Sequence, residues 1–313
     1  MIRILVLHYS QTGQLTRAVQ SMLSPLAGRT DVQIIWQNLE PVEAFPFPWG
    51  FLRFFDTFPE CVHLDPPPIR PVAFAPDARF DLVVLAYQVW FLSPSLPVTA
   101  FLKSAAAQVL RNTPVITFIA CRNMWLSAQE KVKDMLNDVG ARHIDNVVLV
   151  DQGPAWATFI TTPRWVLTGK KNGFWGIFPP AGVSETEIVA AARFGRALAE
   201  SLPLLQSTAG PLLAGLGAVK VLPGYVTGEK IAHRSFRLWG ALLRALGKPG
   251  DLGRRVVLVV YIVFLVAMIL TVMPLSIVVR ALLRPLLRKR LDAEVARLEA
   301  PSGSSTHRLG QYQ

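Results

Sequence analysis

The amino-acid sequence predicts a doubly wound α/β domain of three layers, built on a five-stranded parallel sheet and followed by a C-terminal helix in a membrane. Two observations predict the domain: strand-like and helix-like segments alternate over residues 1–202, and the strand-like segments are mostly continuous apolar runs. Strands covered by helices on both faces have this continuous apolar character, whereas half-exposed strands alternate. A third observation predicts the membrane helix, because residues 256–279 form an apolar run of 24 residues without a charge.

The elements of the domain follow one another in chain order. The five predicted strands are short runs dominated by Val, Ile and Leu, and they cover residues 3–7, 32–36, 81–87, 114–120 and 146–150. The predicted helices have apolar residues at helical spacing, and they cover residues 15–23, 98–107 and 127–139. Ser184 to Glu187 form a capping box, which predicts a final helix that continues to about residue 202. Right-handed crossovers place these helices on both faces of the sheet.

Two insertions interrupt the alternation of strands and helices. Residues 40–79 are rich in Pro and Phe, and residues 152–183 are rich in aromatic residues. Loops of this length are most often functional lids, and their aromatic side chains suit an apolar substrate or a membrane; packing over the domain's own core is the alternative. Residues 203–232 are expected to be a linker. Residues 280–313 are expected to be a basic juxtamembrane segment that ends in a disordered tail.

The net charge of +11 comes from one part of the chain. Residues 220–290 hold 13 Lys and Arg against two acids, and the rest of the chain balances at 19 of each sign. A nucleic-acid-binding domain carries its basic residues on a folded face, so this distribution argues against nucleic acid as a partner. Two cysteines without metal-ligand spacing argue against a disulfide framework and a metal site. We expect no signal peptide and a cytoplasmic domain.

The C-terminal third predicts attachment to the cytoplasmic membrane. A helix over residues 256–279 would reach roughly 36 Å, enough for a hydrocarbon core of about 30 Å. Basic residues flank it on both sides and Pro274 interrupts it, so spanning and re-entry both remain open, with a buried core helix as the alternative. Residues 233–248 place basic residues opposite a stripe that contains Trp239, which predicts a helix in the membrane interface; a surface helix that covers the domain is the alternative.

The segment HYSQTGQLTR at residues 8–17 joins the first strand to its helix and predicts an anion site. A helix N-terminus offers unpaired N–H groups and partial positive charge, so it holds a phosphate without Lys or Arg. Ser10, Thr12 and Thr16 add hydroxyl donors, and Gly13 lets the main chain close around the anion. Neither GxxxxGK[ST] nor GxGxxG is present, which argues against a nucleoside triphosphate or a dinucleotide. A helix cap at Ser10 and an ordinary first-turn residue at Thr16 are the alternatives.

Two later segments end strands at the same edge of the sheet, YQVWFLSPSLPVTAFL at 87–102 and ACRNMWLSAQEKV at 120–132. With the loop at residues 10–16, they make about residues 1–200 resemble the flavodoxin-like family, whose ligand binds where the strand order reverses. The resemblance implies FMN as the cofactor. It implies a phosphate loop whose members are Ser10, Gln11, Thr12, Gly13, Gln14, Leu15 and Thr16, of which Gln14 and Leu15 depart from the family pattern. The other implied cofactor contacts are Gln88, Val89, Trp90, Phe91 and Asn123.

A closer resemblance is to the bacterial family of dialkylresorcinol condensing enzymes. It rests on HYSQTGQLT at residues 8–16 and CRNMW at residues 121–125. This family is understood to aromatise a ring that a partner ketosynthase builds. The resemblance therefore implies an FMN-dependent oxidoreductase, an aromatase that oxidises a cyclohexanedione-type ring in dialkylresorcinol-type lipid or aryl-polyene biosynthesis. It also implies a hydrophobic small-molecule substrate, a ketosynthase and an acyl carrier protein as partners, and contact with membrane lipid; homo-oligomerisation is left open.

Aromatisation of such a ring removes a hydride and a proton, and the strand-end residues are the candidates to assist it. Trp90 is the candidate to stack on the flavin, with a core aromatic as the alternative. Arg122 is the candidate to stabilise negative charge on the reduced ring or to bind a substrate carboxylate, with a surface ion pair as the alternative. The candidates to handle the proton are Tyr9, Tyr87, His8 and Cys121. The residues leave this choice open; His8 is equally well a core histidine, and Asn123 a helix cap.

Other functions fit parts of the sequence. Carbon–carbon condensation needs a Cys nucleophile with a His nearby, and Cys121 with His8 or His143 is available, but the strand pattern is not that of a ketosynthase. A membrane-bound NAD(P)H- or quinone-linked oxidoreductase would share the cofactor and differ in its substrate. An electron carrier would present an acidic face, which this near-neutral domain lacks. A non-catalytic membrane scaffold without FMN is favoured only by the altered pair Gln14 and Leu15.

Overall fold

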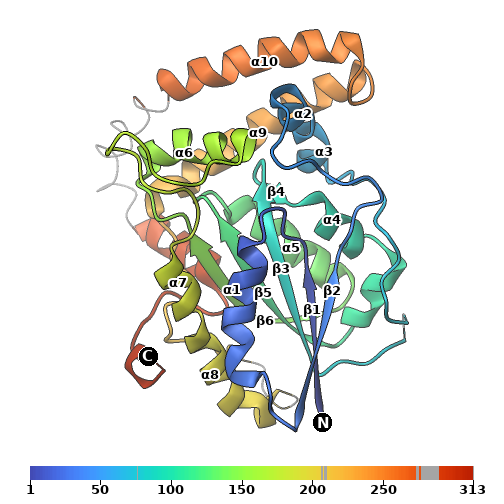
Figure 1. Ribbon diagram of the computed structural model, residues 1–313, viewed down its shortest axis with the longest axis vertical. Helices are drawn as coiled ribbons and strands as arrows, with labels where there is room; N and C mark the ends of the chain where they lie inside the picture. Colours follow the sequence, from blue (N-terminus) through green and yellow to red (C-terminus); the bar gives the residue numbers. More distant parts are fainter. Residues whose placement is uncertain (76, 206, 208–209, 273–274, 276–288, 313) are drawn as a thin grey trace.

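The computed structural model of the protein describes residues 1–75, 77–205, 207, 210–272, 275 and 289–312. Within these residues, five parallel strands form the sheet in the order β2-β1-β3-β5-β6, shown in Figure 1. The strands are β1 Ile2–His8, β2 Val32–Asn38, β3 Leu82–Trp90, β5 Pro114–Cys121 and β6 Arg142–Val150. This is the flavodoxin-like strand order, with its reversal between β1 and β3, so the predicted fold class is confirmed. The short strand β4, Ser93–Pro94, pairs antiparallel with the end of β3 and was not predicted.

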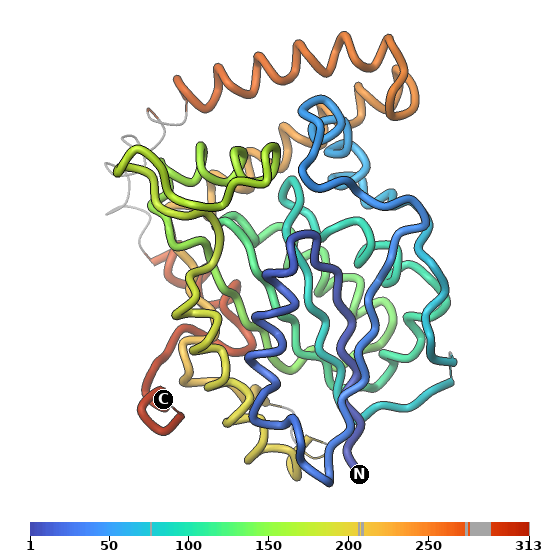
Figure 2. Tube along the Cα trace, in the orientation of Figure 1, coloured from blue at the N-terminus to red at the C-terminus, as the bar shows by residue number. Residues whose placement is uncertain are grey.

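Helices cover both faces of the sheet (Figures 1 and 2). One face carries α1 Gln14–Leu23, α7 Glu185–Ala190 and α8 Ala192–Ser201, and the other carries α4 Leu96–Leu102 and α5 Leu126–Asp138. The capping box is present, because Ser184 Oγ accepts a hydrogen bond from Glu187 N–H at 3.2 Å, but the predicted single helix is divided at Ala191. Short 3-10 turns complete the layers at η1 Ser24–Leu26, η2 Ala105–Leu110, η3 Leu202–Leu204 and η4 Leu309–Gln311.

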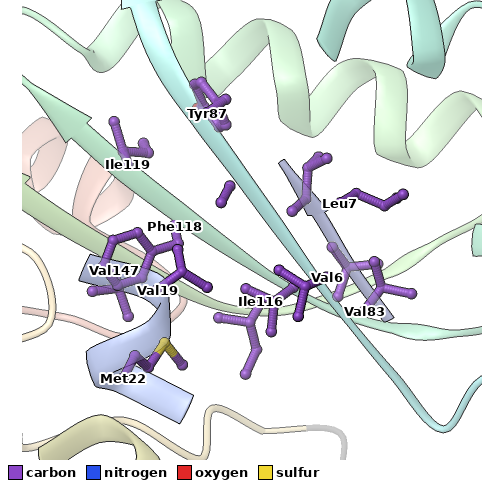
Figure 3. Packing of buried hydrophobic residues seen from close by; sticks show 14 of the residues in the cluster. Val6, Leu7, Val19, Met22, Val83, Tyr87, Ile116, Phe118, Ile119 and Val147 are labelled. Atoms are coloured by element: carbon purple, nitrogen blue, oxygen red, sulfur yellow. The ribbon is translucent and has the colours of Figure 1, made fainter. Parts of the chain in front are cut away.

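The core is a continuous apolar layer on each side of the central strands. The middle residues of β1 and β3 are fully buried, as their uninterrupted apolar sequence predicts. Figure 3 shows Phe118 and Val147 beside Val19 and Met22 of α1. Each such side chain contributes roughly 2 kcal/mol when it leaves water, so the sheet is a rigid platform for the loops at its carboxyl end.

Both insertions contain helices, whereas their sequences predict loops. Residues 40–79 form α2 Phe51–Asp56 and α3 Phe58–His63, and residues 152–183 form α6 Ala155–Thr168. The helices α2 and α3 have six residues each, too few for apolar periodicity to show in the sequence. The longer α6 contains Pro163, a residue that argues against a helix interior. The helices of both insertions lie at the carboxyl ends of the strands (Figure 1).

The segment expected to be a linker, residues 203–232, is part of the domain. Residues 211–221 run beside β6, where Val148 N–H donates to Ala218 O at 2.9 Å. The buried carboxylate of Asp145 accepts hydrogen bonds from Leu212 N–H at 2.7 Å and Leu213 N–H at 3.2 Å, and burial raises its pKa to about 6. The linker prediction is wrong because its buried partners are far away in the sequence and leave no local pattern.

The expected disordered tail is ordered over residues 300–312. Ser302 is buried and its Oγ donates to Asp145 Oδ1 at 2.7 Å, while Gly217 N–H donates to Ser305 O at 2.8 Å. Tyr312 is also buried, and its O–H donates to Glu200 Oε2 at 2.6 Å. The chain end therefore closes the outer edge of β6 instead of extending into solvent.

Two long helices lie at the carboxyl end of the sheet (Figure 1). The first, α9 Pro223–Ala245, begins before the predicted residue 233 and contacts α3 and α5. The second, α10 Leu252–Leu270, contacts α2 and α9 and has a mean hydropathy of 2.3. Among the described residues it is the one helix long and apolar enough to cross a membrane. Most of the predicted continuation to residue 279 lies outside the described residues, and residues 289–299 are helical.

Candidate functional site

The candidate site begins at the turn between β1 and α1, where the strand order reverses. Gly13 has φ 76° and ψ −14°, a left-handed conformation that glycine adopts without strain from a Cβ atom. It caps α1 without any side-chain hydrogen bond, so the N–H groups of the first helical turn have no side-chain acceptor. These N–H groups and the helix dipole favour a negatively charged ligand.

Two hydroxyls in this turn are buried without a partner. Neither Ser10 Oγ nor Thr12 Oγ1 has a hydrogen bond among the described residues, although both atoms are out of contact with solvent. Buried polar atoms are almost always paired, because an unpaired one costs about 1–3 kcal/mol. Both hydroxyls are donors beside a helix N-terminus, so a phosphate group satisfies them and the helix at once.

Gln11 connects this turn to the first insertion and to β3. Its Nε2 donates to Pro46 O at 2.9 Å, its Oε1 accepts from Trp49 Nε1 at 2.9 Å, and its main-chain N–H lies 3.4 Å from Gln88 Oε1. The Gln11 side chain therefore holds the first insertion over the turn. Because its amide is already hydrogen-bonded, its role is to fix the position of the loop.

The next three predicted cofactor residues turn their side chains away from the turn. Gln14 exchanges two hydrogen bonds with the main chain of Val183, Nε2 to O at 3.1 Å and N–H to Oε1 at 3.0 Å. Leu15 is fully buried in the core, and Thr16 Oγ1 lies 3.4 Å from His8 Nδ1. Gln14 and Leu15 therefore leave only their main-chain N–H groups facing the turn as candidate ligand donors.

An aromatic cluster lies beside the turn and contains the predicted stacking residue. The Trp90 ring centroid lies 5.8 Å from Tyr9, 5.0 Å from Phe45 and 5.7 Å from Trp49, each in an edge-to-face arrangement. Trp90 and Tyr9 were predicted from the strand ends. Phe45 and Trp49 come from the first insertion, whose aromatic content gave the only signal for them.

The other predicted residues of β3 have separate positions. The strand extends to Trp90, so Gln88 and Val89 lie in the sheet and not in a loop, and Val89 packs against the core. Phe91 has φ 48°, and its ring centroid lies 4.9 Å from that of Phe54. Phe91 therefore belongs to the packing between the first insertion and α9, apart from Trp90.

The segment after β5 divides between two environments. The Arg122 guanidinium lies 3.9 Å from the ring centroid of Phe159 in α6, and burial lowers its pKa without removing its charge at neutral pH. Burial also raises the pKa of the Cys121 thiol, which keeps it protonated and unsuited to nucleophilic catalysis. Asn123 lines a separate cavity of about 200 Å³ with Tyr225 and Val150.

Tyr87 does not reach the site. Its side chain is fully buried, and Figure 3 shows it in the core near Ile119. Its O–H donates to Gln129 Oε1 at 2.5 Å, and burial raises its pKa well above the ordinary value. This placement excludes Tyr87 from proton transfer at the crevice, and the prediction failed because the strand runs three residues further than expected.

The remaining proton-handling candidates are neutral at neutral pH. Burial raises the pKa of Tyr9 to about 12, so the phenol keeps its proton and acts as a donor. Burial lowers the pKa of His8, whose ring lies edge-on to Trp36 at 5.5 Å. No group of three or more His, Cys, Asp or Glu among the described residues is arranged to hold a metal ion.

The second insertion adds two threonines that sequence analysis missed. Thr161 and Thr162 of α6 also have hydroxyls that are buried and unpaired among the described residues. The helix is held beside the first insertion, because Trp49 N–H donates to Val166 O at 2.9 Å. Their only signal was the pair TT inside an aromatic segment, which gave no reason to single them out.

Asp151 is a further residue of this region that the sequence patterns do not single out. It follows β6 directly, and its carboxylate accepts hydrogen bonds from Gly153 N–H at 2.8 Å and Gly182 N–H at 2.5 Å. These bonds join the two ends of the second insertion. The carboxylate thereby fixes the positions at which the second insertion leaves the domain, before α6, and rejoins it at Gly182.

A cleft of about 630 Å³ opens between the first insertion and the turn that joins α9 to α10. Phe45 lines it, and the same ring belongs to the aromatic cluster around Trp90. Five ionic side chains of the cleft are paired, Arg254 with Asp56 and Glu60, and Arg244 with Asp65. The part of the cleft beside Phe45 is apolar, because the ring of Phe45 lines it there.

No protein-family model matches the chain, and no curated protein matches it. Solved structures with a similar fold include a flavoprotein in complex with FMN from Lactobacillus acidophilus NCFM, at 16% identity and a TM-score of 0.38, covering 47% of this chain and 93% of that one. A putative flavoprotein from Bacteroides eggerthii DSM 20697 is 15% identical with a TM-score of 0.36, covering 47% and 87%. A flavodoxin, WrbA-like protein from Agrobacterium tumefaciens is 8% identical with a TM-score of 0.34, covering 65% and 98%.

Proposed function

We propose that this chain is a flavoprotein that binds the phosphate of FMN in the turn between β1 and α1. The observation that carries the proposal is the pair of buried, unpaired hydroxyls of Ser10 and Thr12 beside the uncapped N-terminus of α1. A phosphate dianion completes the hydrogen bonding of both hydroxyls and of the first-turn N–H groups. No Lys or Arg is needed there, because the helix N-terminus supplies the positive potential.

The residues around the turn suit a flat aromatic cofactor. Trp90, held edge-on by Tyr9 and Phe45, offers a ring to stack on an isoalloxazine. Tyr9 keeps its proton and donates a hydrogen bond. Arg122 brings a positive charge to the end of β5, supported by the face of Phe159. When bound, FMN supplies a hydride acceptor, and the chain supplies position and electrostatics.

We further propose that the chain acts as an aromatase on a cyclohexanedione-type ring with hydrophobic arms, in dialkylresorcinol-type lipid or aryl-polyene biosynthesis. The proposal is supported by the resemblance carried by residues 8–16 and 121–125. It is also supported by the position of Phe45, whose ring lines the cleft and contacts Trp90. The ring loses one hydride and one proton to become aromatic. A ketosynthase that builds the ring and an acyl carrier protein that delivers it are the partners this proposal requires.

The cofactor proposal is tested by titrating the purified chain into FMN and following the quenching of flavin fluorescence. We expect the double variant Ser10→Ala/Thr12→Val to bind FMN at least ten-fold more weakly, about 1.4 kcal/mol, because two phosphate donors are lost. Ser24→Ala is the matched control, an exposed serine at the far end of α1, and its affinity should equal that of the wild type. Equal affinity for all three proteins would overturn the site, and a wild type without FMN binding would favour the scaffold function.

The substrate proposal needs a separate measurement on FMN-loaded protein. Under anaerobic conditions, a 2-alkylcyclohexane-1,3-dione should bleach the flavin absorbance near 450 nm and yield the corresponding resorcinol, with one ring oxidised per flavin. Reduction by NAD(P)H followed by transfer to a quinone, with no reaction of the dione, would instead support the NAD(P)H- or quinone-linked oxidoreductase.

A further inference from the structure

Four elements at one end of the molecule expose apolar side chains. The helices α2, α6, α9 and α10 all lie beyond the carboxyl ends of the strands (Figures 1 and 2). On α10 the exposed side chains are Val256, Val259, Val260, Val263, Val266 and Leu270, and on α9 they are Ile231, Leu238, Leu242 and Leu246. The two insertions add Phe51, Leu52, Trp156, Ile160, Trp175 and Ile177. We call this set of residues the apolar end face.

The apolar helix α10 is fixed along the domain and does not project from it. Arg254, in its first turn, is fully buried; its Nε donates to Asp56 Oδ1 at 2.7 Å and its Nη2 to Glu60 Oε2 at 2.7 Å. Further along, Tyr261 stacks on Phe58 with ring centroids 4.4 Å apart. Withdrawing α10 would leave the two carboxylates and the guanidinium without partners in a buried site, which is strongly unfavourable.

One side of α10 is therefore committed to the domain, and the other is available. Leu258, Tyr261 and Ile262 are buried against α2, α3 and α9, whereas Val256 and Val263 are 66% and 65% exposed. A fixed helix with this division has its long axis parallel to the end face. The exposed apolar side chains of α10 extend from Val256 to Leu270, along most of the helix. A stripe of this length suits contact with the flat apolar layer of a membrane leaflet.

The second insertion extends the face beyond the helices. Trp175 is 82% exposed and Ile177 66% exposed, in a small hairpin closed by the stacked rings of Phe174 and Phe178 at 4.6 Å. Tryptophan at such a position is typical of the boundary between lipid head groups and acyl chains.

The charge around the apolar end face is positive. Residues 223–270 contain Glu229 and Asp251 as their only acids, and Glu229 is fully buried. Arg234, Arg237, Lys248 and Arg255 are exposed on α9, α10 and the turn between them, while the exposed Arg244 and Lys230 are paired with Asp65 and Glu294. Basic side chains around an apolar surface complement anionic lipid head groups.

We propose that the apolar end face docks in one leaflet of a membrane that contains anionic lipids, with α10 lying in the plane of the leaflet instead of crossing it. The helix, the Trp175 hairpin and the tip of α2 enter the interface together, and the basic residues of α9 contact the head groups. This docking is independent of the cofactor. If the proposed function holds as well, the cleft beside Phe45 receives its hydrophobic substrate at the membrane surface.

The first test measures binding of the full chain to vesicles by flotation, with phosphatidylcholine alone and with 30% phosphatidylglycerol. We expect binding that is strengthened by phosphatidylglycerol and weakened about ten-fold by the double variant Trp175→Ser/Ile177→Ser. Val189→Ser is the matched control, because Val189 is 70% exposed on α7, away from this end, and its substitution should leave vesicle binding unchanged. Absence of binding, or equal binding by the hairpin variant, would overturn the proposal.

The second test determines the orientation of α10 by depth. A fluorescent label is placed by Val256→Cys, Val263→Cys or Leu270→Cys, in a Cys61→Ser/Cys121→Ser background, and is quenched by nitroxides at a shallow or a deep acyl position. An in-plane helix gives the same shallow depth at all three positions. A central label much deeper than the outer two would show a spanning helix, and burial of the label by self-association without lipid would show a second copy of the chain; either result overturns the proposal. FMN affinity measured on the same proteins keeps this test separate from that of the cofactor site.

Discussion

The turns that follow β1 and β6 lie at the same edge of the sheet and have opposite hydrogen-bonding states. After β6, Asp151 accepts two main-chain hydrogen bonds at 2.8 and 2.5 Å, and the turn is closed by its own carboxylate. After β1, the Ser10 and Thr12 hydroxyls are buried and unpaired, and Gly13 leaves the helix without a side-chain cap. The turn after β6 is closed by its own residues, whereas the turn after β1 is, under the proposed function, completed by a phosphate. The difference separates a structural polar residue from a binding residue.

The largest expected effect comes from opening the closed turn. Asp151→Ala should lower the free energy of unfolding by about 3 kcal/mol, because the buried N–H groups of Gly153 and Gly182 lose a charged acceptor. Urea denaturation followed by tryptophan fluorescence measures this. Asp134→Ala, at an exposed position on α5, is the control and should change stability by less than 0.5 kcal/mol, within roughly the range of surface substitutions. A loss below 1 kcal/mol for Asp151→Ala would show that the carboxylate does not close the turn.

The second prediction strains the open turn. Gly13→Ala should cost about 1.5 kcal/mol of stability, because alanine resists the φ of 76° even though no atom lies within 4 Å of the added Cβ. Gly28→Ala has the same unoccupied surroundings and a φ of 85°, so it should cost a similar amount. FMN affinity distinguishes the two, since we expect a loss for Gly13→Ala alone. An unchanged affinity in both variants would place the phosphate elsewhere.

The third prediction concerns the sign of a stability change. Thr12→Val should stabilise the FMN-free protein by about 1 kcal/mol, because a methyl group replaces a buried hydroxyl that has no partner. Thr158→Val is the same substitution at a buried threonine whose hydroxyl donates to Ala155 O at 2.9 Å, and it should destabilise the protein. Thermal unfolding without FMN measures both. Destabilisation by Thr12→Val would indicate that its hydroxyl serves the fold.

The smallest expected effect is a pH dependence confined to the closed turn. Burial raises the pKa of Asp151 above its ordinary 3.8, so between 3.8 and the raised value the folded protein binds more protons than the unfolded chain. Stability contributed by this group is therefore present at low pH and lost as the pH rises through that window. The wild type should show this decline relative to Asp151→Asn when unfolding is measured from pH 3.5 to 7. A rise with pH relative to Asp151→Asn would contradict the assignment.

Strands and the turn after β1 could be predicted because their patterns are local. Apolar runs marked all five parallel strands, and the hydroxyls of Ser10 and Thr12 with Gly13 marked the turn that remains the candidate anion site. The side-chain directions of Gln14 and Leu15 could not be predicted, because Val183 and the core residues that they contact come from distant parts of the chain.

Buried polar residues were the main omission. Asp145 and Asp151 bond to main-chain groups that sequence patterns do not identify, and each fixes a segment that looked like a loop or linker. The α6 threonines were missed because a hydroxyl becomes informative only when the structure shows that nothing pairs with it.

The covering of β6 by two distant segments has a consequence for biosynthesis. Its outer edge is paired with Ala218 and secured through Ser302, whose Oγ accepts a hydrogen bond from Asn146 N–H at 2.7 Å. Until residues 302–305 have been synthesised, the nascent domain has an incompletely protected strand edge of the kind that recruits other chains. A premature stop before Ser302 would therefore give a product prone to aggregation even though all five parallel strands had been made.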